Sequence, residues 1–322
     1  MRNWKTGAED IQNVAVLIFP RFSNHCLANV IEPLRAANEA LGRAAYTWEL
    51  VSLDGEMVES SSGMPVLPKC KLSDHLGGEF LFVASSYDVQ KFANSQTARA
   101  LRSAENKFSV VAGLDTGAWL MAHAGLLEGA EATIHWDELT AFSESFANVD
   151  VVAERFVHQG NRITCGGAMT AFDLILDLIG RQHGEVIKLE VADLFVPQDT
   201  RSRSHYLRHQ HASSEVNKCL KLMSENVESP LTIAELAEMA DTNQKTLNRL
   251  FVTELGAPPK SVYRRIRLST ARRLAKQSNY TITEITLRSG YINAAAMTRA
   301  FVEEFGQTPS ALRKDAKLTT YP

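Results

Sequence analysis

Apolar residues in the first 190 positions follow two alternating patterns. Short runs rich in β-branched and aromatic residues predict buried strands, and recurrence every three or four positions predicts amphipathic helices between them. Strands are expected at Val14–Phe19, Trp48–Leu53, Glu79–Ala84, Phe108–Ala112 and Ala132–His135. Helices are expected at Leu27–Leu41, Val89–Ala104 and Gly117–Ala124, and hairpin or edge segments at Met57–Val66 and Val151–Thr164. This alternation predicts an α/β domain with a largely parallel sheet over residues 11–195.

The pattern changes after a helix that ends near Phe195. Residues 196–212 are polar and charged and contain Pro197, which predicts a linker. Residues 213–315 are predicted to be an all-α domain that contains an internal repeat. The frame Arg-x-Phe-Val-x-Glu-x-Gly-x-x-Pro occurs at 249–259 and again at 299–309. Upstream of the frames the offset between the copies is 49 rather than 50, so the second copy has one extra residue in its turn.

Each copy is predicted to fold as a helix, a short turn and a second helix. Thr232 and Glu235 have the capping-box spacing at the start of the first helix, and Thr281 and Glu284 repeat it. A glycine and then a proline end each copy. These are two helix-turn-helix units. They cover about residues 231–256 and 281–306, and an arginine-rich helix at 261–277 joins them.

The charge of the chain is unevenly distributed. The net charge of −3 would by itself argue against a nucleic-acid binder. Residues 1–200, however, contain 15 Lys and Arg against 26 Asp and Glu, a net charge of −11, whereas residues 201–322 contain 19 against 11, a net charge of +8. An acidic body followed by a basic region indicates a partner that carries negative charge.

Cysteine spacing and hydropathy exclude several classes of protein. The four cysteines are widely separated and form no C-x-x-C pattern, so we expect no zinc site, no other metal, no cofactor and no disulfide framework. The apolar run at Val14–Phe19 is too short to cross a membrane, and no signal-peptide cleavage pattern follows it. These features favour a cytoplasmic protein with no membrane partner.

A glycine-flanked segment, Gly113-Leu114-Asp115-Thr116-Gly117, follows the fourth predicted strand and opens a helix. It resembles the nucleophile elbow of the class I glutamine amidotransferase-like, PfpI-type superfamily, in which a Gly-x-Cys-x-Gly turn presents a cysteine. The segments 124–129, 132–136 and 163–168 follow in the order that the superfamily uses. The resemblance covers about residues 11–190 and implies a flavodoxin-like, amidotransferase-like domain.

The chain departs from this superfamily at the nucleophile. Asp115 stands where the enzymes have a thiolate, and a carboxylate is a much poorer acyl acceptor, so we expect no catalytic residue and a sensor domain instead of an enzyme. His135 matches the superfamily's base, and Glu32 lies where it keeps an acidic partner. A carboxylate beside an aromatic ring suits a cationic ligand. The expected ligand-binding residues are Asp115, Thr116, His135, Trp136, Glu32 and Ser85.

Structural roles for the same residues remain open at this stage. Asp115 is also placed to cap the helix that follows it. Trp119 and Trp136 are candidates for the core as well as for an aromatic wall, for which Tyr87 is a third candidate. His135 is equally suited to a hydrogen-bonded structural role.

The duplicated helix-turn-helix region resembles the DNA-binding domain of the AraC/XylS family of transcription regulators. With a PfpI-type domain before it, the chain resembles the GlxA-like subfamily, whose members respond to small nitrogen compounds. The resemblance implies a transcriptional activator that binds promoter or operator double-stranded DNA and responds to a small nitrogenous effector, such as an amino acid or a cationic betaine. It also implies contact with RNA polymerase and a homodimer formed through the N-terminal domain. Alternatives are an amidohydrolase-like enzyme fused to a DNA-binding domain and a constitutive DNA-organising protein.

The second helix of each unit is expected to enter the major groove with its N-terminal residues toward the bases. The first unit offers Asn243, Gln244, Lys245, Thr246, Asn248 and Arg249. The second unit offers Asn293, Ala294, Ala295, Thr298 and Arg299. Because alanine can contact only thymine methyl groups or backbone, we expect the first unit to make more of the hydrogen-bonded contacts. Leu236, Phe251, Ile285 and Phe301 are expected in the core, and the arginines at 261–277 are expected to contact the DNA backbone or solvent.

Overall fold

A computed structural model describes residues 10–195 and 213–318 of the chain. The chain divides into two compact units, and the second consists of the residues from His183 onward together with the short segment Ala40–Gly42. Helix α6 (Glu185–Phe195) groups with the second unit. The linker expected at 196–212 lies outside the described residues. None of the helices in these two described ranges is long and apolar enough to cross a membrane.

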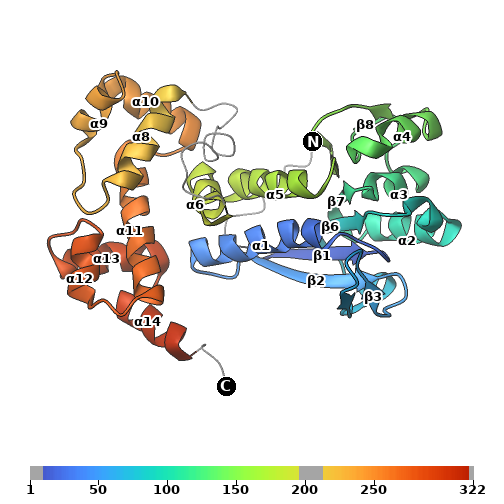
Figure 1. The fold of residues 1–322 in the computed structure, drawn as a ribbon, viewed down its shortest axis with the longest axis horizontal. Coiled ribbons are helices and arrows are strands. Elements are labelled where there is room, and N and C mark those ends of the chain that lie inside the picture. Colours follow the sequence, from blue (N-terminus) through green and yellow to red (C-terminus); the bar gives the residue numbers. More distant parts are fainter. Residues whose placement is uncertain (1–9, 196–212, 319–322) are drawn as a thin grey trace. The chain divides into compact units, whose positions relative to one another are not determined.

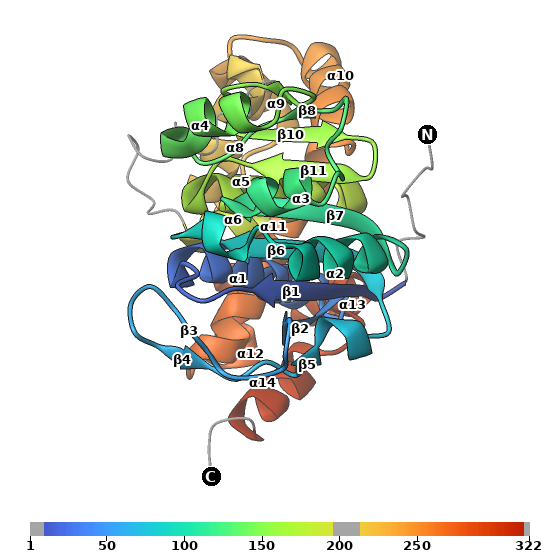
Figure 2. The ribbon, with the colours of Figure 1, turned by 90° about the vertical axis from the view of Figure 1, so that its right-hand side faces the viewer.

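The first unit is built on a seven-stranded sheet with the order β10-β11-β7-β6-β1-β2-β5 (Figures 1 and 2). The strands are β1 (Gln12–Ile18), β2 (Tyr46–Ser52), β5 (Cys70–Lys71), β6 (Gly78–Ser85), β7 (Phe108–Asp115), β10 (Phe156–Gln159) and β11 (Arg162–Cys165). All neighbours pair in parallel except β10 and β11, which form an antiparallel hairpin. The largely parallel sheet is therefore confirmed. The hairpin expected near Met57–Val66 is present as β3 (Val58–Glu59) and β4 (Pro65–Val66).

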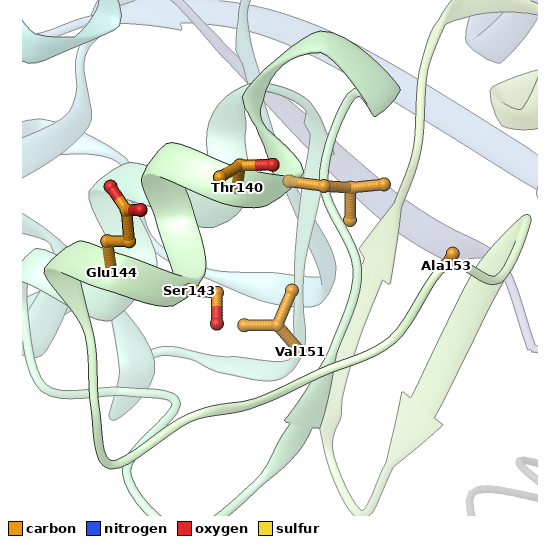
Figure 3. Close-up of a pocket in the computed structure, with 6 residues that line it drawn as sticks. Thr140, Ser143, Glu144, Val151 and Ala153 are labelled. Atoms are coloured by element: carbon orange, nitrogen blue, oxygen red, sulfur yellow. The ribbon is translucent and has the colours of Figure 1, made fainter.

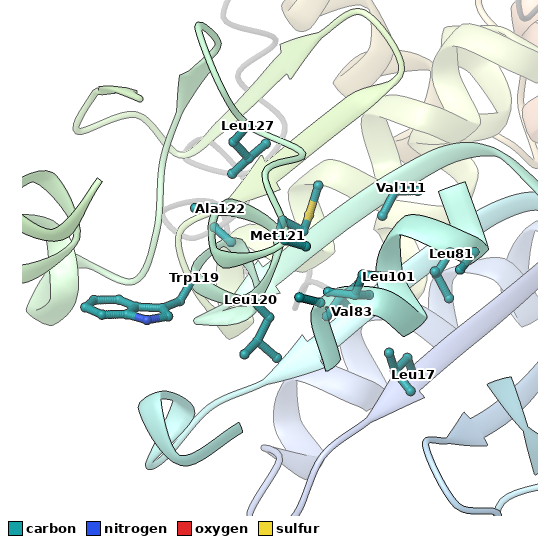
Figure 4. Packing of buried hydrophobic residues seen from close by; sticks show 14 of the residues in the cluster. Leu17, Leu81, Val83, Leu101, Val111, Trp119, Leu120, Met121, Ala122 and Leu127 are labelled. Carbon is teal, nitrogen blue, oxygen red and sulfur yellow. The ribbon is translucent and has the colours of Figure 1, made fainter. Parts of the chain in front are cut away.

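Helices cover both faces of this sheet. Helices α1 (Asn24–Leu41) and α5 (Ala168–His183) lie on one face, and α2 (Ser95–Glu105) and α3 (Gly117–His123) lie on the other (Figure 2). Both faces of the strands are therefore buried, which explains why the strands read as continuous apolar runs. Figure 4 shows the core on the α2 and α3 face. Its labelled strand residues are Leu17, Leu81, Val83 and Val111.

Two expected elements differ from the structure. The strand expected at Ala132–His135 is wrong, because only β8 (Glu131–Ala132) is extended, and it pairs with β9 (Asp150–Val151) outside the main sheet. The backbone of the next residues bonds elsewhere: the His135 N–H donates to the carbonyl of Asp115 at 3.0 Å. The helix expected at Val89–Ala104 is interrupted, because the Asn94 side chain caps a new helix that starts at Ser95.

The second compact unit, which contains both helix-turn-helix units, is helical and has two small cores. Its helices are α8 (Ser214–Glu225), α9 (Ile233–Met239), α10 (Gln244–Leu255), α11 (Pro259–Gln277), α12 (Ile282–Arg288), α13 (Ala294–Phe305) and α14 (Pro309–Leu318). Leu236 and Phe251 are fully buried in the first core, and Ile285 and Phe301 are fully buried in the second, as expected. Helix α11 contributes residues to both cores, so it joins the two helix-turn-helix units.

The helix ends of the two units match the sequence patterns. Capping boxes are present at Thr232 and Thr281, each with the glutamate three residues later. Gly256 and Gly306 end α10 and α13 in the left-handed conformation, with φ of 71° and 72°. The prolines that follow do more than stop a helix, because each is the first residue of the next one, α11 or α14.

Candidate effector site and DNA interface

The turn between β7 and α3 is held in a conformation that few residues adopt. Asp115, at the end of β7, has a φ of 60°, in the left-handed region. The two flanking glycines are needed because the chain passes close to itself here. A Cβ at Gly113 would lie 2.6 Å from the Ala118 nitrogen, and one at Gly117 would overlap the carbonyl oxygen of Val83. The chain thus makes a tight turn from strand β7 to helix α3, with the carboxylate of Asp115 at its tip.

The Asp115 side chain turns toward the loop that follows β6. Its Oδ2 accepts a hydrogen bond of 2.6 Å from the Ser86 hydroxyl, and Ser86 Oγ in turn accepts the Ser23 N–H at 3.0 Å. The N-terminal cap residue of α3 is Thr116, whose hydroxyl donates to the Ser86 carbonyl instead of capping the helix. Helix capping is therefore not the role of Asp115.

The electrostatics of Asp115 follow from its burial. Asp115 is only 7% exposed, and the resulting desolvation raises the pKa of its carboxyl group above the ordinary value. The Ser86 hydroxyl and the nearby His135 act in the opposite direction and do not cancel this effect. No Lys or Arg among the described residues forms an ion pair with this carboxylate, and a bound cation would lower its pKa again.

Two polar atoms at this strand end lack a hydrogen-bond partner within the described residues. Ser85 is 1% exposed, and its Oγ accepts and donates no hydrogen bond there. Ser85 is the register partner of Asp115 in the neighbouring strand. Asp115 Oδ1 likewise receives no hydrogen bond from the part of the chain that is described. Buried polar groups are normally satisfied, so the Ser85 hydroxyl next to Asp115 indicates a position for a polar ligand or water.

The aromatic residues near the elbow divide into core and surface. Trp119 is buried and packs on Phe142 and Phe146, with ring centroids 5.9 and 5.3 Å away, so it belongs to the core (Figure 4). Trp136 is 70% exposed, and its ring centroid lies 5.4 Å from that of His135. The Tyr87 ring is already covered by the guanidinium of Arg21, 5.2 Å from its centroid. Trp136 is therefore the one of these rings with an open face.

His135 and Glu32 have different relations to the elbow. The Nδ1 atom of His135 accepts the Asp137 N–H at 3.4 Å, so in the neutral ring the proton is on Nε2, which lies beside Gly167. Glu32, on α1, bonds to Arg35 at 2.7 Å and is half exposed. Among the described contacts none joins Glu32 to Asp115.

Two cysteines lie near the turn, and neither thiol is ionised. Cys26 and Cys165 are both buried, and both are close enough to Asp115 for its negative charge to raise their pKa values. Burial is the larger cause, and it raises the pKa of Cys165 to about 11. Both thiols are therefore protonated at neutral pH.

A cavity in the first compact unit lies away from the elbow residues. It has a volume of about 420 Å³ and lies between α4 (Leu139–Ser145) and the segment around β9 (Figure 3). It is lined by Leu139, Thr140, Ser143, Glu144, Val151 and Ala153. None of the residues expected to bind a ligand lines it. Groups of three or more metal-ligating side chains are also absent from the described residues.

The expected base-contacting residues lie on the outer surface of α10. Gln244, Lys245, Asn248 and Arg249 are exposed, whereas Leu247 faces the core. Thr246 is partly buried. Asn243 is the N-terminal cap of this helix, and its Oδ1 accepts the Thr246 N–H at 2.9 Å. Only the amide nitrogen of Asn243 is then left to approach a base.

The recognition helix of the second helix-turn-helix unit, α13, presents a much less polar surface. Asn293 caps α13 by accepting the N–H groups of Ala295 and Ala296 at 2.8 and 3.2 Å. The first turn of α13 is made of alanines, of which Ala295 is exposed and Ala294 partly buried. Arg299 is exposed one turn later, with Thr298 beside it and partly buried. Hydrogen-bonding side chains are therefore concentrated on α10.

Several arginines of α11 are part of the fold, contrary to expectation. Arg265 donates to Glu304 at 2.5 Å, and the guanidinium of Arg272 lies over the Phe305 ring. Arg267 bonds to two backbone carbonyls in the turn of the second unit. The expectation of contacts with the DNA backbone or solvent was wrong for Arg265 and Arg272, which are buried, whereas Arg273 of the same helix is exposed.

Comparison with known proteins decides the family. Residues 12–181 match the model of the DJ-1/PfpI family, and residues 236–315 match a helix-turn-helix domain. The transcriptional regulator CdhR of Pseudomonas aeruginosa is 33% identical over 93% of this chain and 90% of its own length. The chain belongs to the DJ-1/PfpI family and is an HTH-type transcriptional regulator.

Other relatives of this DJ-1/PfpI-type regulator agree. GbdR of Pseudomonas aeruginosa, also an HTH-type transcriptional regulator, is 29% identical over 95% of this chain and 85% of its own length. A crystal structure of an AraC family transcriptional regulator from Pseudomonas putida aligns with a TM-score of 0.51 at 20% identity, over 57% of this chain and 99% of that one. That likeness supports the fold of the first unit. The regulator thus combines a DJ-1/PfpI domain with a helix-turn-helix DNA-binding domain.

Proposed function

We propose that this regulator is controlled by a small cationic nitrogen compound bound at the Asp115 elbow. The observation that carries the proposal is the buried Ser85 hydroxyl, which has no hydrogen-bond partner among the described residues and lies in register with Asp115, whose Oδ1 receives no hydrogen bond from them. An ammonium group would satisfy the carboxylate and remove the cost of its burial. The exposed face of Trp136 offers a cation–π surface beside it. His135 and Thr116 complete the site, and Glu32 stays a more distant candidate.

Loss of catalysis in this domain is part of the proposal. Acyl transfer by this fold needs a thiolate at the elbow, and Asp115 supplies a carboxylate with an open oxygen. The neighbouring Cys26 and Cys165 thiols are protonated because of their burial. The domain therefore supports recognition and not amide hydrolysis.

The DNA contacts proposed for the two units differ in chemistry. In α10, Gln244, Lys245, Asn248 and Arg249 suit hydrogen bonds to adenine and guanine edges. In α13, Arg299 and Thr298 are the polar candidates. Asn243 and Asn293 act first as helix caps, and they position the helices that make the contacts.

Partner interactions beyond DNA belong to the same proposal. A homodimer formed through the first domain would place four recognition helices on an operator, and contact with RNA polymerase would make the protein an activator. Cytoplasmic location follows, because promoter DNA is the target.

A thermal-shift screen of the full chain with amino acids, betaines and polyamines tests the effector site. A ligand that binds the native state stabilises it by RT ln(1 + [L]/Kd), so a cationic compound at 100 times its Kd should add about 2.7 kcal/mol. We expect Asp115→Asn to abolish this shift, because it removes the charge and keeps the shape. Operator binding without ligand should be unchanged.

Asp137→Asn is the matched control, because Asp137 is an exposed carboxylate in the same loop as His135. It should keep the full thermal shift. An effector that stabilises Asp115→Asn as much as the unaltered chain would place the site elsewhere. Hydrolysis of an amide substrate that disappears in His135→Ala would favour the enzyme instead.

A further inference from the structure

The structure locates the extra residue of the second helix-turn-helix unit. In the first turn the Thr242 N–H donates to the carbonyl of Ala237, and in the second the Tyr291 N–H donates to that of Thr286, both at 2.9 Å. Thr242 and Tyr291 are therefore equivalent. The next residue in the first unit is the helix cap Asn243, but in the second unit Ile292 comes before the cap, Asn293. Ile292 is the insertion.

Ile292 is the most exposed of the large hydrophobic residues in the described chain, at 99%. Leaving an isoleucine in water forfeits the free energy that its burial would provide. The three residues after the cap, 294–296, are alanines, so no polar side chain stands between Ile292 and the first turn of α13. The N-terminal end of this helix is thus an apolar surface of Ile292, Ala294 and Ala295.

The turn holds Ile292 in a fixed position. Arg267 donates to the carbonyls of Ser289 and Gly290 at 3.0 and 2.7 Å, and its guanidinium lies 4.2 Å from the centroid of the Tyr291 ring. Gly290 has a φ of 73°, and a Cβ there would lie 2.6 Å from Cγ of Pro230. With Asn293 fixed as a cap on the other side, the exposed side chain is presented by a rigid backbone.

We infer that Ile292, together with Ala294 and Ala295, contacts the C5-methyl groups of thymines in the major groove. The inference rests on the proposed function, in which the N-terminal ends of α10 and α13 face the base edges. The thymine methyl is the apolar group on the major-groove edge, and an aliphatic side chain beside the start of a recognition helix is placed to meet it. The first unit has no counterpart of Ile292, and it presents Gln244 and Lys245 instead.

The two units therefore select DNA by different chemistry. The first unit selects through hydrogen bonds, and the second selects thymines through apolar contact. Because the units are carried by one chain and joined by α11, the preferred DNA should contain a hydrogen-bonded segment and, about one helical turn (~34 Å) away, a segment defined by thymines.

The experiment starts from duplexes that the full chain selects from random double-stranded DNA. Each thymine of the selected sequence is then replaced by uracil, which removes the methyl group and no hydrogen-bonding atom. We expect one or two such replacements to weaken binding about fourfold each, the factor that corresponds to about 0.8 kcal/mol per buried methyl group. In Ile292→Ala the same duplexes with and without the methyl should bind alike at one of these positions.

Leu287→Ala is the control, because Leu287 is an exposed leucine, at 58%, on α12 of the same unit. It should keep the preference for thymine over uracil. Failure to enrich any sequence would refute the proposed function itself. Enrichment of a sequence in which uracil costs nothing, or costs Ile292→Ala as much as the unaltered chain, would overturn the inference alone. A changed oligomeric state of Ile292→Ala in sedimentation, with thymine preference intact, would overturn it in favour of a protein contact.

Discussion

Asp115 combines a left-handed backbone with a buried carboxylate. The position suits a small side chain that tolerates positive φ, and Asp and Asn are the non-glycine residues that do so most readily. The sequence indicated the turn through the spacing of Gly113 and Gly117, although only the close approach at Gly113 is local, because a Cβ at Gly117 would meet Val83 of β6. The sequence did not predict the hydrogen bond between Asp115 and Ser86, because Ser86 is 29 positions away and lies in a different loop.

The raised pKa of Asp115 predicts a pH-dependent stability difference. A carboxyl whose pKa is raised on folding stabilises the protein at low pH, and that contribution is lost as pH rises through the folded-state pKa. At pH 7 Asp115→Asn should therefore have a higher melting temperature than the unaltered chain. The gain should shrink as the pH falls through the raised folded-state pKa and should be absent below the ordinary Asp value of 3.8. Tryptophan fluorescence follows this domain, because all four tryptophans precede residue 137.

Asp137→Asn serves as the control here also, because its carboxylate is exposed and should show no such difference. A melting temperature of Asp115→Asn below that of the unaltered chain at pH 7 would mean that the ionised carboxylate is stabilised by the fold.

The helix ends in the DNA-binding domain were predictable from the sequence, whereas one strand and one helix in the DJ-1/PfpI domain were not. Capping boxes at Thr232 and Thr281 act within four residues, so the sequence contains the whole interaction. The failure at Ala132–His135 has a tertiary cause, because the His135 N–H bonds to the distant elbow. The arginines of α11 show the same limit, since their partners Glu304 and Ser289 are 39 and 22 residues away.

The turn of the second helix-turn-helix unit contains Gly290, and its surroundings predict that replacing it destabilises the protein more than replacing Gly256 does. Gly290→Ala adds strain at positive φ and a clash with Val227 and Pro230, so we expect it to lower the free energy of unfolding by about 2–4 kcal/mol. Gly256→Ala has a similar φ with open space around it, and should cost about 1–2 kcal/mol. Urea unfolding of both variants followed by circular dichroism at 222 nm measures the difference. Equal costs would mean that the turn adjusts without strain.

The two domains of the molecule carry net charges of opposite sign. The net charge of −11 belongs to the residues that carry the DJ-1/PfpI domain and that of +8 to those that carry the helix-turn-helix domain. Regulation requires that occupation of the first domain changes the DNA affinity of the second. By linkage the effect must be reciprocal.

The proposed effector site and the DNA-binding domain should therefore be coupled. An effector found in the thermal-shift screen should change operator affinity by about 5- to 150-fold, and operator DNA should change effector affinity by the same factor. Fluorescence anisotropy with labelled DNA measures the first factor, and calorimetry measures the second. Asp115→Asn should reduce both to one. Tight effector binding with no change in DNA affinity would contradict control through this site.

The sequence by itself determined the alternation of strands and helices, the glycine elbow, the duplicated units and their caps. Each of these depends on interactions among neighbouring residues or on a repeating pattern, which the order of residues specifies directly. The folded structure was needed to show that Asp115 bonds to Ser86, that Ser85 has no hydrogen-bond partner among the described residues, that Arg265 and Arg272 are buried, and that Ile292 is the inserted residue. Those features depend on segments far apart in the chain that only folding brings together.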